Sequence, residues 1–200
     1  MPEQTDRPAL RRRMRAIRRA LTPLARMAGA EAVAHRLLAL PFAPVEGYVA
    51  GYWAMDGEIA LHAWQVHLPK ALTYCLPVVC RDHVLRFAPW RAGDGLVSNR
   101  YGIPEPDIPD AALIAADRMS LVVTPLVAFD PRGHRLGMGG GWYDRTFAFR
   151  RDRQAPPYLV GAAFADQQAD GIEAEAWDVS LDAVCTNTST FDLHEKSAHA

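Results

Sequence analysis

Residues 121–145 read LVVTPLVAFDPRGHRLGMGGGWYDR and connect an apolar strand to a helix through a cluster of glycines. The apolar start of this stretch is typical of a buried strand, and four of the five residues 137–141 are glycine. Glycines allow a ligand close to the backbone, and a helix that begins there directs unpaired N–H groups and its positive dipole end toward that ligand. The stretch therefore predicts an anion site, most simply for phosphate, at the end of a strand.

Charged residues flank this glycine cluster. Arg135 offers a guanidinium fork to a phosphate, and Asp144 offers a carboxylate to the divalent cation that accompanies a nucleotide. The cluster is not a dinucleotide fingerprint, because Trp142 stands where that pattern needs its last glycine, and it is not a Walker loop, because Lys70 and Lys196 are the only lysines and lie far away. The alternative interpretation is that the glycine cluster is a flexible connector. The charged residues close to the cluster favour anion binding instead.

Segments with helical and strand periodicity alternate along the chain. We predict helices at 7–20, 23–40, 59–68 and 143–151, and strands at 45–53, 73–79, 84–87, 158–164 and 182–186 in addition to the strand that begins at 121. Residues 91–109 are rich in Gly, Pro, Asp and Asn and predict a long loop that covers something, and the last eight residues look frayed. This alternation predicts a three-layer α/β/α fold with a mostly parallel, Rossmann-like sheet and ligands at the carboxyl ends of its strands.

Composition limits the classes of function. The 200 residues are 50% apolar and predict one domain spanning 1–200, and the net charge of −1 gives no general reason to expect nucleic acid or anionic lipid as a partner. No apolar run is long enough for a membrane span and no secretory signal is apparent, so we expect a cytoplasmic protein without a membrane partner. Three widely spaced cysteines, Cys75, Cys80 and Cys185, predict buried reduced thiols rather than disulfides or a metal site.

The helix predicted at 7–20 has a strongly basic face. Arg7 and Arg11 are four residues apart, so both side chains project from one face and could clamp a polyphosphate. We interpret the other arginines as a solvated face, namely Arg12, Arg13, Arg15 and Arg18. A nucleic-acid-binding arm and a transit peptide are alternatives; the lack of interleaved aromatic residues disfavours the first, and the direct run into a well-capped second helix disfavours the second.

Four further residues are candidates with simple structural alternatives. Glu58 follows a turn and could instead cap the helix after it, and Trp53 could stack on a flat heterocycle or simply belong to the core. Asp178 and Asp182 lie before the last strand and could be metal ligands or surface turn residues.

Taken together and in chain order, these residues resemble the 5-formyltetrahydrofolate cyclo-ligase family, also called methenyltetrahydrofolate synthetases. The resemblance rests on Arg7 and Arg11, Glu58, the Gly-Ile-Pro-Glu-Pro run at 102–106, the block at 129–145 and Asp178. It implies an enzyme that uses ATP and Mg²⁺ to cyclise 5-formyltetrahydrofolate to 5,10-methenyltetrahydrofolate, with release of ADP and phosphate. By this resemblance the phosphoryl group of ATP activates the formyl oxygen, and the neighbouring folate nitrogen then attacks the activated carbon.

The resemblance also implies roles for individual residues. Arg135, Asp144 and Glu58 would be catalytic, and Asp144 with Asp178 would bind Mg²⁺, with Asp182 as the alternative to Asp178. ATP would contact Arg7, Arg11 and the loop Arg135, Leu136, Gly137, Met138, Gly139, Gly140, Gly141, Trp142 and Tyr143. Folate would contact Trp53, Glu58 and residues Met138 to Trp142.

These roles leave small molecules as the only expected partners, and the expected assembly is a monomer or a weak homodimer. A sugar-phosphate isomerase or an acyl-CoA enzyme on a similar sheet would also need an anion-binding loop, but it would not need ATP. A small basic-armed nucleic-acid-binding module is the non-enzymatic alternative.

Overall fold

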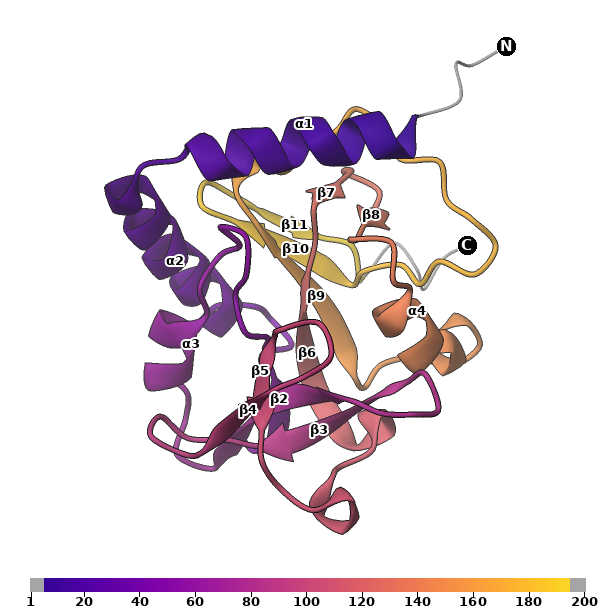
Figure 1. Ribbon diagram of the computed structural model, residues 1–200. Helices are drawn as coiled ribbons and strands as arrows, with labels where there is room; N and C mark the ends of the chain where they lie inside the picture. Colours follow the sequence, from indigo (N-terminus) through magenta and orange to yellow (C-terminus); the bar gives the residue numbers. More distant parts are fainter. Residues whose placement is uncertain (1–5, 195–200) are drawn as a thin grey trace.

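A seven-stranded, mostly parallel sheet is the centre of the computed structural model, which describes residues 6–194 (Figure 1). The order across the sheet is β11-β10-β9-β6-β1-β2-β3; the five inner strands run parallel, and β3 and β11 pair antiparallel at the two edges. The strands are β1 Gly47–Ala50, β2 Leu72–Val79, β3 Leu85–Pro89, β6 Met119–Pro125, β9 Tyr158–Ala163, β10 Ala183–Thr186 and β11 Thr190–Asp192. The predicted mostly parallel α/β fold is confirmed.

Alternate residues of each strand feed two separate apolar cores. In β6, Leu121 and Val123 pack with helices α2 (Pro23–Leu38) and α3 (His62–Val66), whereas Val122 packs on the opposite face. That second face is covered near α4 (Trp142–Thr146), where Phe147 is fully buried. The period-2 alternation of the strand thus places helices on both faces of the sheet.

Helix α1 (Arg7–Ala20) lies across the edge of the sheet where the parallel strands end, beside β7 (Ala128–Phe129) and β8 (Arg135–Leu136) (Figure 1). Its amino end is capped by the Asp6 side chain, which accepts a 3.0 Å hydrogen bond from the Ala9 N–H. Its apolar side chains Leu10 and Met14 are buried in one cluster with Leu136 and other residues of the β7–β8 hairpin. The basic, amphipathic helix is thereby fixed beside the glycine-rich segment.

The sequence predictions differ from the structure chiefly at the ends of elements. Strand β1 is shorter than the predicted 45–53, because Val45 is exposed and pairing begins at Gly47. Helix α3 is shorter than the predicted 59–68, and no side chain caps its start. The helix predicted at 143–151 is two pieces, because Phe147 leaves the helical conformation (φ −104°, ψ 18°) and a 3-10 helix, Ala148–Arg151, follows.

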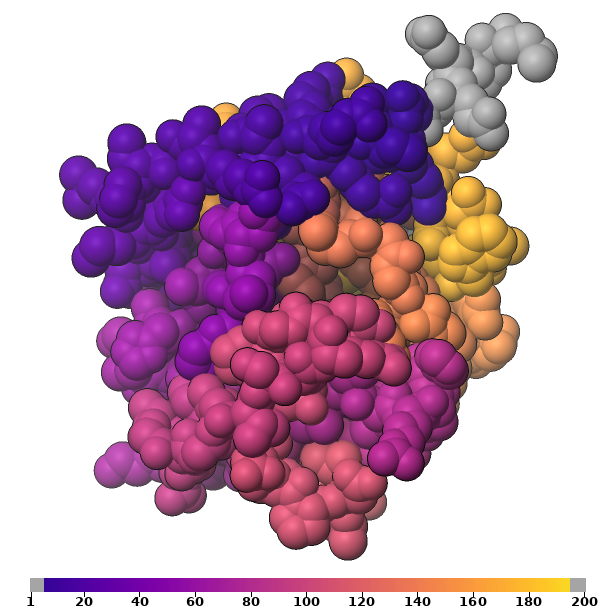
Figure 2. Space-filling view, viewed as in Figure 1, coloured from indigo at the N-terminus to yellow at the C-terminus, as the bar shows by residue number. Residues whose placement is uncertain are grey.

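Short hairpins account for what the sequence analysis missed. The predicted loop 91–109 contains β4 (Leu96–Ser98) and β5 (Pro104–Pro106), which pair antiparallel. Strands β7, β8 and β11 were not predicted, because runs of two or three residues carry no readable period. Figure 2 shows the 91–109 segment spread over the lower front of the molecule, and that it covers a ligand site stays a prediction.

Three remaining expectations concern thiols, membranes and the carboxyl end of the chain. All three cysteines are free; Cys75 and Cys185 are buried, and burial raises the pKa of each to about 12, whereas Cys80 is only half-buried. Within residues 6–194, no helix is long and apolar enough to cross a bilayer. Most of the carboxyl-terminal stretch expected to fray, 195–200, lies outside the described residues.

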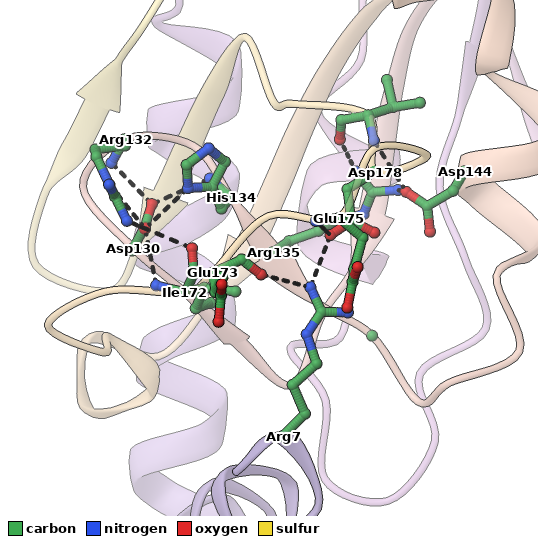
Figure 3. A network of polar contacts seen from close by, with 12 residues as sticks. Arg7, Asp130, Arg132, His134, Arg135, Asp144, Ile172, Glu173, Glu175 and Asp178 are labelled. Carbon is green, nitrogen blue, oxygen red and sulfur yellow. Dashed lines mark hydrogen bonds and ion pairs between the residues drawn. The ribbon is translucent and has the colours of Figure 1, made fainter. Parts of the chain in front are cut away.

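The fully buried carboxylate of Asp130 organises the turn between β7 and β8 (Figure 3). It accepts hydrogen bonds from the backbone N–H groups of Arg132, His134 and Ile172 at 2.9, 3.1 and 3.0 Å. It also pairs with the Arg132 guanidinium at 3.0 Å and with Nδ1 of His134 at 3.1 Å. Burial alone would raise the pKa of Asp130, but the hydrogen bonds from Ile172 and His134 hold it below its ordinary value.

We expect Asp130→Ala to lower the free energy of unfolding by about 2–4 kcal/mol, because buried N–H groups lose their acceptor. Since the folded-state pKa of Asp130 is lowered, the stabilisation that its carboxylate provides is fully present above the unfolded-state pKa of Asp130. This stabilisation is lost as pH falls through the folded-state pKa. Urea unfolding of wild type and variant over a range of acidic pH values measures this. The exposed Asp166→Ala is the control, and a loss equal to that of the control would contradict the role.

Candidate active site

The glycine-rich segment, defined as residues 137–141, turns sharply between β8 and α4. Gly139 and Gly141 have positive φ values of 97° and 64°, which glycine adopts without strain. A Cβ on Gly140 would lie 2.9 Å from the Trp142 ring, and one on Gly141 would lie 2.8 Å from Nη1 of Arg145. Nothing lies within 4 Å of the Cβ position of Gly137, so the segment leaves open space at its start, while the positive φ values favour glycine at 139 and 141.

Helix α1 brings Arg7 and Arg11 to this segment, as their four-residue spacing predicts. The Nε of Arg11 donates to the Gly137 carbonyl at 2.9 Å. Partial burial and, second, the positive charge of Arg7 lower the pKa of Arg11, because two like charges lie near each other. The Arg11 guanidinium beside the open glycine turn, with the positive charge of Arg7 near it, creates a positive potential that favours an anion.

Arg7 has an acidic partner, Asp178 (Figure 3). Its Nη2 donates to Oδ2 of Asp178 at 2.8 Å and to the Glu173 carbonyl at 2.7 Å. The same carboxylate of Asp178 accepts from the Glu175 N–H at 3.0 Å. The structure thus brings Arg7 and Asp178 together across 171 residues of sequence.

A second pair, Arg135 and Asp144, lies beside the first (Figure 3). Nη2 of Arg135 is 2.5 Å from Oδ1 of Asp144, and its Nη1 donates to the Val179 carbonyl. The Val179 N–H donates back to Oδ1 of Asp144 at 3.2 Å. Only 6% of the Arg135 side chain is exposed, so here it braces Asp144 and the 178–179 segment and is not a free phosphate fork.

Asp144 and Asp178, the carboxylates predicted to bind Mg²⁺, are linked through the 178–179 segment. Val179, which donates to Asp144, directly follows Asp178, and each carboxylate is held by one arginine. Mg²⁺ in such complexes takes only one or two carboxylates, because phosphates and water fill its other positions. Among the residues described, there is no group of three or more His, Cys, Asp or Glu side chains that could hold a metal ion by themselves.

Asp182, the alternative to Asp178, has a structural environment. Its carboxylate pairs with Arg150 at 2.8 and 3.1 Å and accepts from the Leu159 N–H at 2.7 Å. Both side chains of the pair are 9% exposed. These bonds tie the start of β9 to the segment before β10 and leave Asp182 little freedom to bind a metal.

Glu58 lies in the turn that follows β1. It does not cap α3, as the structural alternative supposed; instead its Oε2 accepts from the Met55 N–H at 2.9 Å. Its side chain is 12% exposed, and burial raises the pKa of Glu58. Burial first and the negative charge of Glu58 second raise the pKa of Tyr143.

Trp53, on the same connection, is half-buried and packs against the core. Its ring meets Trp90 edge-on, with centroids 5.8 Å apart. Trp53 therefore packs at the edge of the core, in agreement with the alternative that it belongs to the core. Its contact with folate stays a prediction. The face seen in Figure 2 is hollowed between α1, the 91–109 segment and the 130–142 segment.

Three side chains of the predicted loop have different surroundings. Leu136 is buried against α1, and its carbonyl accepts from the Val127 N–H at 2.7 Å, so its side chain is part of the core. Met138 is 55% exposed. The Trp142 ring lies between the guanidinium carbons of Arg100 and Arg145, which are 5.2 and 5.1 Å from its centroid.

The sequence analysis missed two contributors to this region. The tip of the β4–β5 hairpin brings Arg100 and Tyr101 against Trp142, a contact across about forty residues that no local pattern signals. Arg18 was interpreted as solvated, and that is wrong: its side chain has no exposed surface. Its position three and four residues after Arg15 and Met14 on the buried side of the helical period was the available signal.

Comparison with known proteins identifies close relatives. The sequence profile described as the 5-formyltetrahydrofolate cyclo-ligase family matches residues 3–187. The 5-formyltetrahydrofolate cyclo-ligase of Haemophilus influenzae is 33% identical over 88% of this chain and 94% of its own, and that of Escherichia coli is 34% identical over 88% and 97%.

Solved structures agree with the sequence relatives. The 5,10-methenyltetrahydrofolate synthetase of Aquifex aeolicus superposes with a TM-score of 0.77 at 26% identity, covering 94% of this chain and 92% of that one. A 5,10-methenyltetrahydrofolate synthetase from Mycoplasma pneumoniae, 24% identical with a TM-score of 0.72, shares the fold over 92% of this chain and 99% of its own.

The buried carboxyl of Glu58 gives a test of the site without substrate. Because its folded-state pKa is raised, its contribution to stability is present below the unfolded-state pKa and is lost as pH rises through the folded-state pKa. We expect Glu58→Gln, which stays neutral and can accept the Met55 bond, to gain stability relative to wild type as pH rises from mildly acidic to neutral.

Chemical unfolding at several pH values measures this difference. The exposed Glu46→Gln is the matched control and should show no such trend. A Glu58→Gln difference that stays constant, or that falls with rising pH, would show that the carboxyl is not destabilised by burial.

Proposed function

Because the chain belongs to the 5-formyltetrahydrofolate cyclo-ligase family, we propose that it converts 5-formyltetrahydrofolate and ATP into 5,10-methenyltetrahydrofolate, ADP and phosphate in the presence of Mg²⁺. The observation that supports the ATP-dependent step is that Arg11 donates to Gly137 of the open glycine turn, while the Arg7–Asp178 and Arg135–Asp144 pairs meet at residues 178–179. The whole reaction takes place within one domain in this proposal.

The chemistry explains why these residue types are needed. The oxygen of a formyl group that is bound to nitrogen is a poor leaving group. Phosphoryl transfer from ATP converts that oxygen into a phosphate ester, which leaves more easily. The neighbouring folate nitrogen then forms a bond to the formyl carbon, and the carbon–oxygen bond breaks as phosphate departs. Catalysis of such transfers is mainly positioning and charge neutralisation, which arginines and a glycine-rich turn can supply.

Residues of α1 and the glycine-rich segment would hold ATP. Arg7 and Arg11 would contact its phosphates, and the backbone from Arg135 to Tyr143 would surround them. Mg²⁺, held by Asp144 and Asp178, would neutralise charge on the phosphates. The Arg7–Asp178 and Arg135–Asp144 pairs keep these side chains in place beforehand, and Arg7 would exchange its carboxylate partner for phosphate when the nucleotide binds.

Residues after β1 would hold the folate. Glu58 and Trp53 lie on the connection that leaves the carboxyl end of β1, next to β6, whose continuation carries the glycine-rich segment. Adjacent parallel strands therefore deliver the two half-sites to one edge of the sheet. Residues Met138 to Trp142 would contact both substrates, and the exposed Met138 side chain is available for such a contact.

The direct test is an assay of the purified protein with 5-formyltetrahydrofolate, ATP and Mg²⁺, followed by the absorbance of methenyltetrahydrofolate. Product should accumulate only when all three are present. Absence of product from protein shown to be folded would overturn the proposal.

We expect Asp144→Asn to lower kcat by at least about 100-fold, because the charge that holds Mg²⁺ is lost. The amide oxygen can still accept from Arg135 and Val179, so thermal unfolding should change little. Asp152→Asn, an exposed neighbour, is the control. If Asp144→Asn turned over at the wild-type rate when Mg²⁺ is limiting, the assignment of Asp144 as a Mg²⁺ ligand would be contradicted.

For Glu58→Gln, the kinetic defect should be on the folate side. We expect kcat/KM for 5-formyltetrahydrofolate to fall by roughly tenfold or more, with less than about a twofold change in the KM for ATP. Steady-state kinetics with each substrate varied in turn measures the two effects. A defect confined to the KM for ATP would count against the assignment.

A further inference from the structure

Arg18 of α1 is a fully buried arginine with four acceptor groups around it. Its Nε donates to the Asp56 carbonyl at 2.9 Å, and its Nη2 donates to Oδ2 of Asp56 at 3.0 Å. Its Nη1 donates to the Leu126 carbonyl at 3.2 Å and lies 3.8 Å from Oε1 of Glu58. A charge with no exposed surface is retained only where such partners offset its loss of water.

These partners belong to both halves of the candidate active site. Asp56 and Glu58 lie in the turn after β1, whereas Leu126 directly follows β6 on the path to the glycine-rich segment. The side-chain amide of Gln167, after β9, donates to the same Leu126 carbonyl at 3.3 Å and to Val127 at 2.9 Å. Arg18 is therefore the side chain that joins the Glu58 turn to the chain leading to the nucleotide side.

The turn itself has a conformation that needs support. Asp56 has a positive φ of 52°, which costs energy for a residue with a Cβ, and Gly57 follows at 77°. Arg15 binds Oδ2 of Asp56 at 2.7 Å, and Arg19 also pairs with this carboxylate. Burial would raise the pKa of Asp56, but hydrogen bonds from Arg15, Arg19 and Arg18 lower it overall, so it stays ionised as the anchor.

Glu58 has Arg18 as its cationic neighbour. Burial raises the pKa of Glu58, while the charge of Arg18 opposes that effect and the charge of Asp56 adds to it. Burial first and the negative charge of Glu58 second raise the pKa of Tyr52 and of Tyr143. The ionised form and the position of Glu58 therefore both respond to the Arg18 guanidinium.

We propose that Arg18 is a positioning residue: its guanidinium holds the Glu58 turn in register with the chain that leads from β6 to the glycine-rich segment, so that Glu58 faces the folate substrate. This inference rests on the proposed function for the identity of the substrate. The three nitrogens of the planar guanidinium each reach a different acceptor, whereas a lysine carries all its donors on one nitrogen and cannot span the same three positions.

Arg18→Lys, which keeps the charge and loses the fork, tests this. We expect kcat/KM for 5-formyltetrahydrofolate to fall by about tenfold through KM, with the KM for ATP changed by less than about twofold. In a double-mutant cycle, Arg18→Lys should add less than about threefold to the effect of Glu58→Gln, because both act through one carboxylate. Arg19→Lys, which touches the same Asp56 from an exposed position, is the matched control and should behave as wild type.

Amide hydrogen exchange tests the contacts of Arg18 independently of enzyme activity. In Arg18→Lys, amides at 55–58 and 126–128 should exchange faster, while those of β9 and β10 should not change. If the wild type makes no product, the proposed function fails, and exchange alone decides the inference. Unchanged exchange at both segments, or unchanged kinetics in an active enzyme, would overturn it.

A second variant covers the case in which Arg18→Lys does not fold. Asp56→Asn keeps the backbone acceptor and suits the positive φ, but it weakens the anchor for Arg18. It should show the same folate-specific rise in KM, smaller in size, and a normal KM for ATP. An unchanged folate KM in Asp56→Asn would overturn the inference.

Discussion

The packing of α1 over the carboxyl ends of the parallel strands holds the candidate active site together. Leu10 and Met14 bury their side chains against the β7–β8 hairpin, at about 1.5–3 kcal/mol for each fully buried side chain. The same helix directs Arg11 to Gly137 and Arg18 to Asp56 and Leu126. Through Arg18 this helix contacts the connections after β1 and β6 together.

Although the chain has a net charge of −1, helix α1 is strongly basic, and several of its arginines form ion pairs with carboxylates elsewhere in the fold. Arg15, Arg18 and Arg19 share Asp56, and Arg7 pairs with Asp178 at the other end of the helix. In the first group Arg18 is wholly buried and supports the fold, whereas Arg19 joins Asp56 from the surface. The second lies at the proposed phosphate site, where exchange of partners with a ligand costs less because the pair is partly exposed.

Strong local signals made much of the architecture predictable. Asp6 and Thr22 accept from Ala9 and Ala25 as helix caps, and the first helix has the predicted bounds. The long apolar strands also lie where their patterns predict them. The β4–β5, β7–β8 and β11 pairings escaped prediction, because each strand has two or three residues and is stabilised by a partner found only after the chain has folded.

For the site, the residue types and their order along the chain predicted a glycine-bounded phosphate turn, Arg7 and Arg11 on one helix face, and roles for Asp144 and Glu58, and these assignments stay predictions. Periodicity and glycine content are local properties, so the sequence expresses them directly. The pairing of Arg7 with Asp178, the bracing of Asp144 by Arg135, the structural use of Asp182 and the burial of Arg18 were decided by the tertiary structure alone. These contacts are set by how α1 crosses the sheet, and a helix pattern shows which face is basic but not which carboxylate that face will meet.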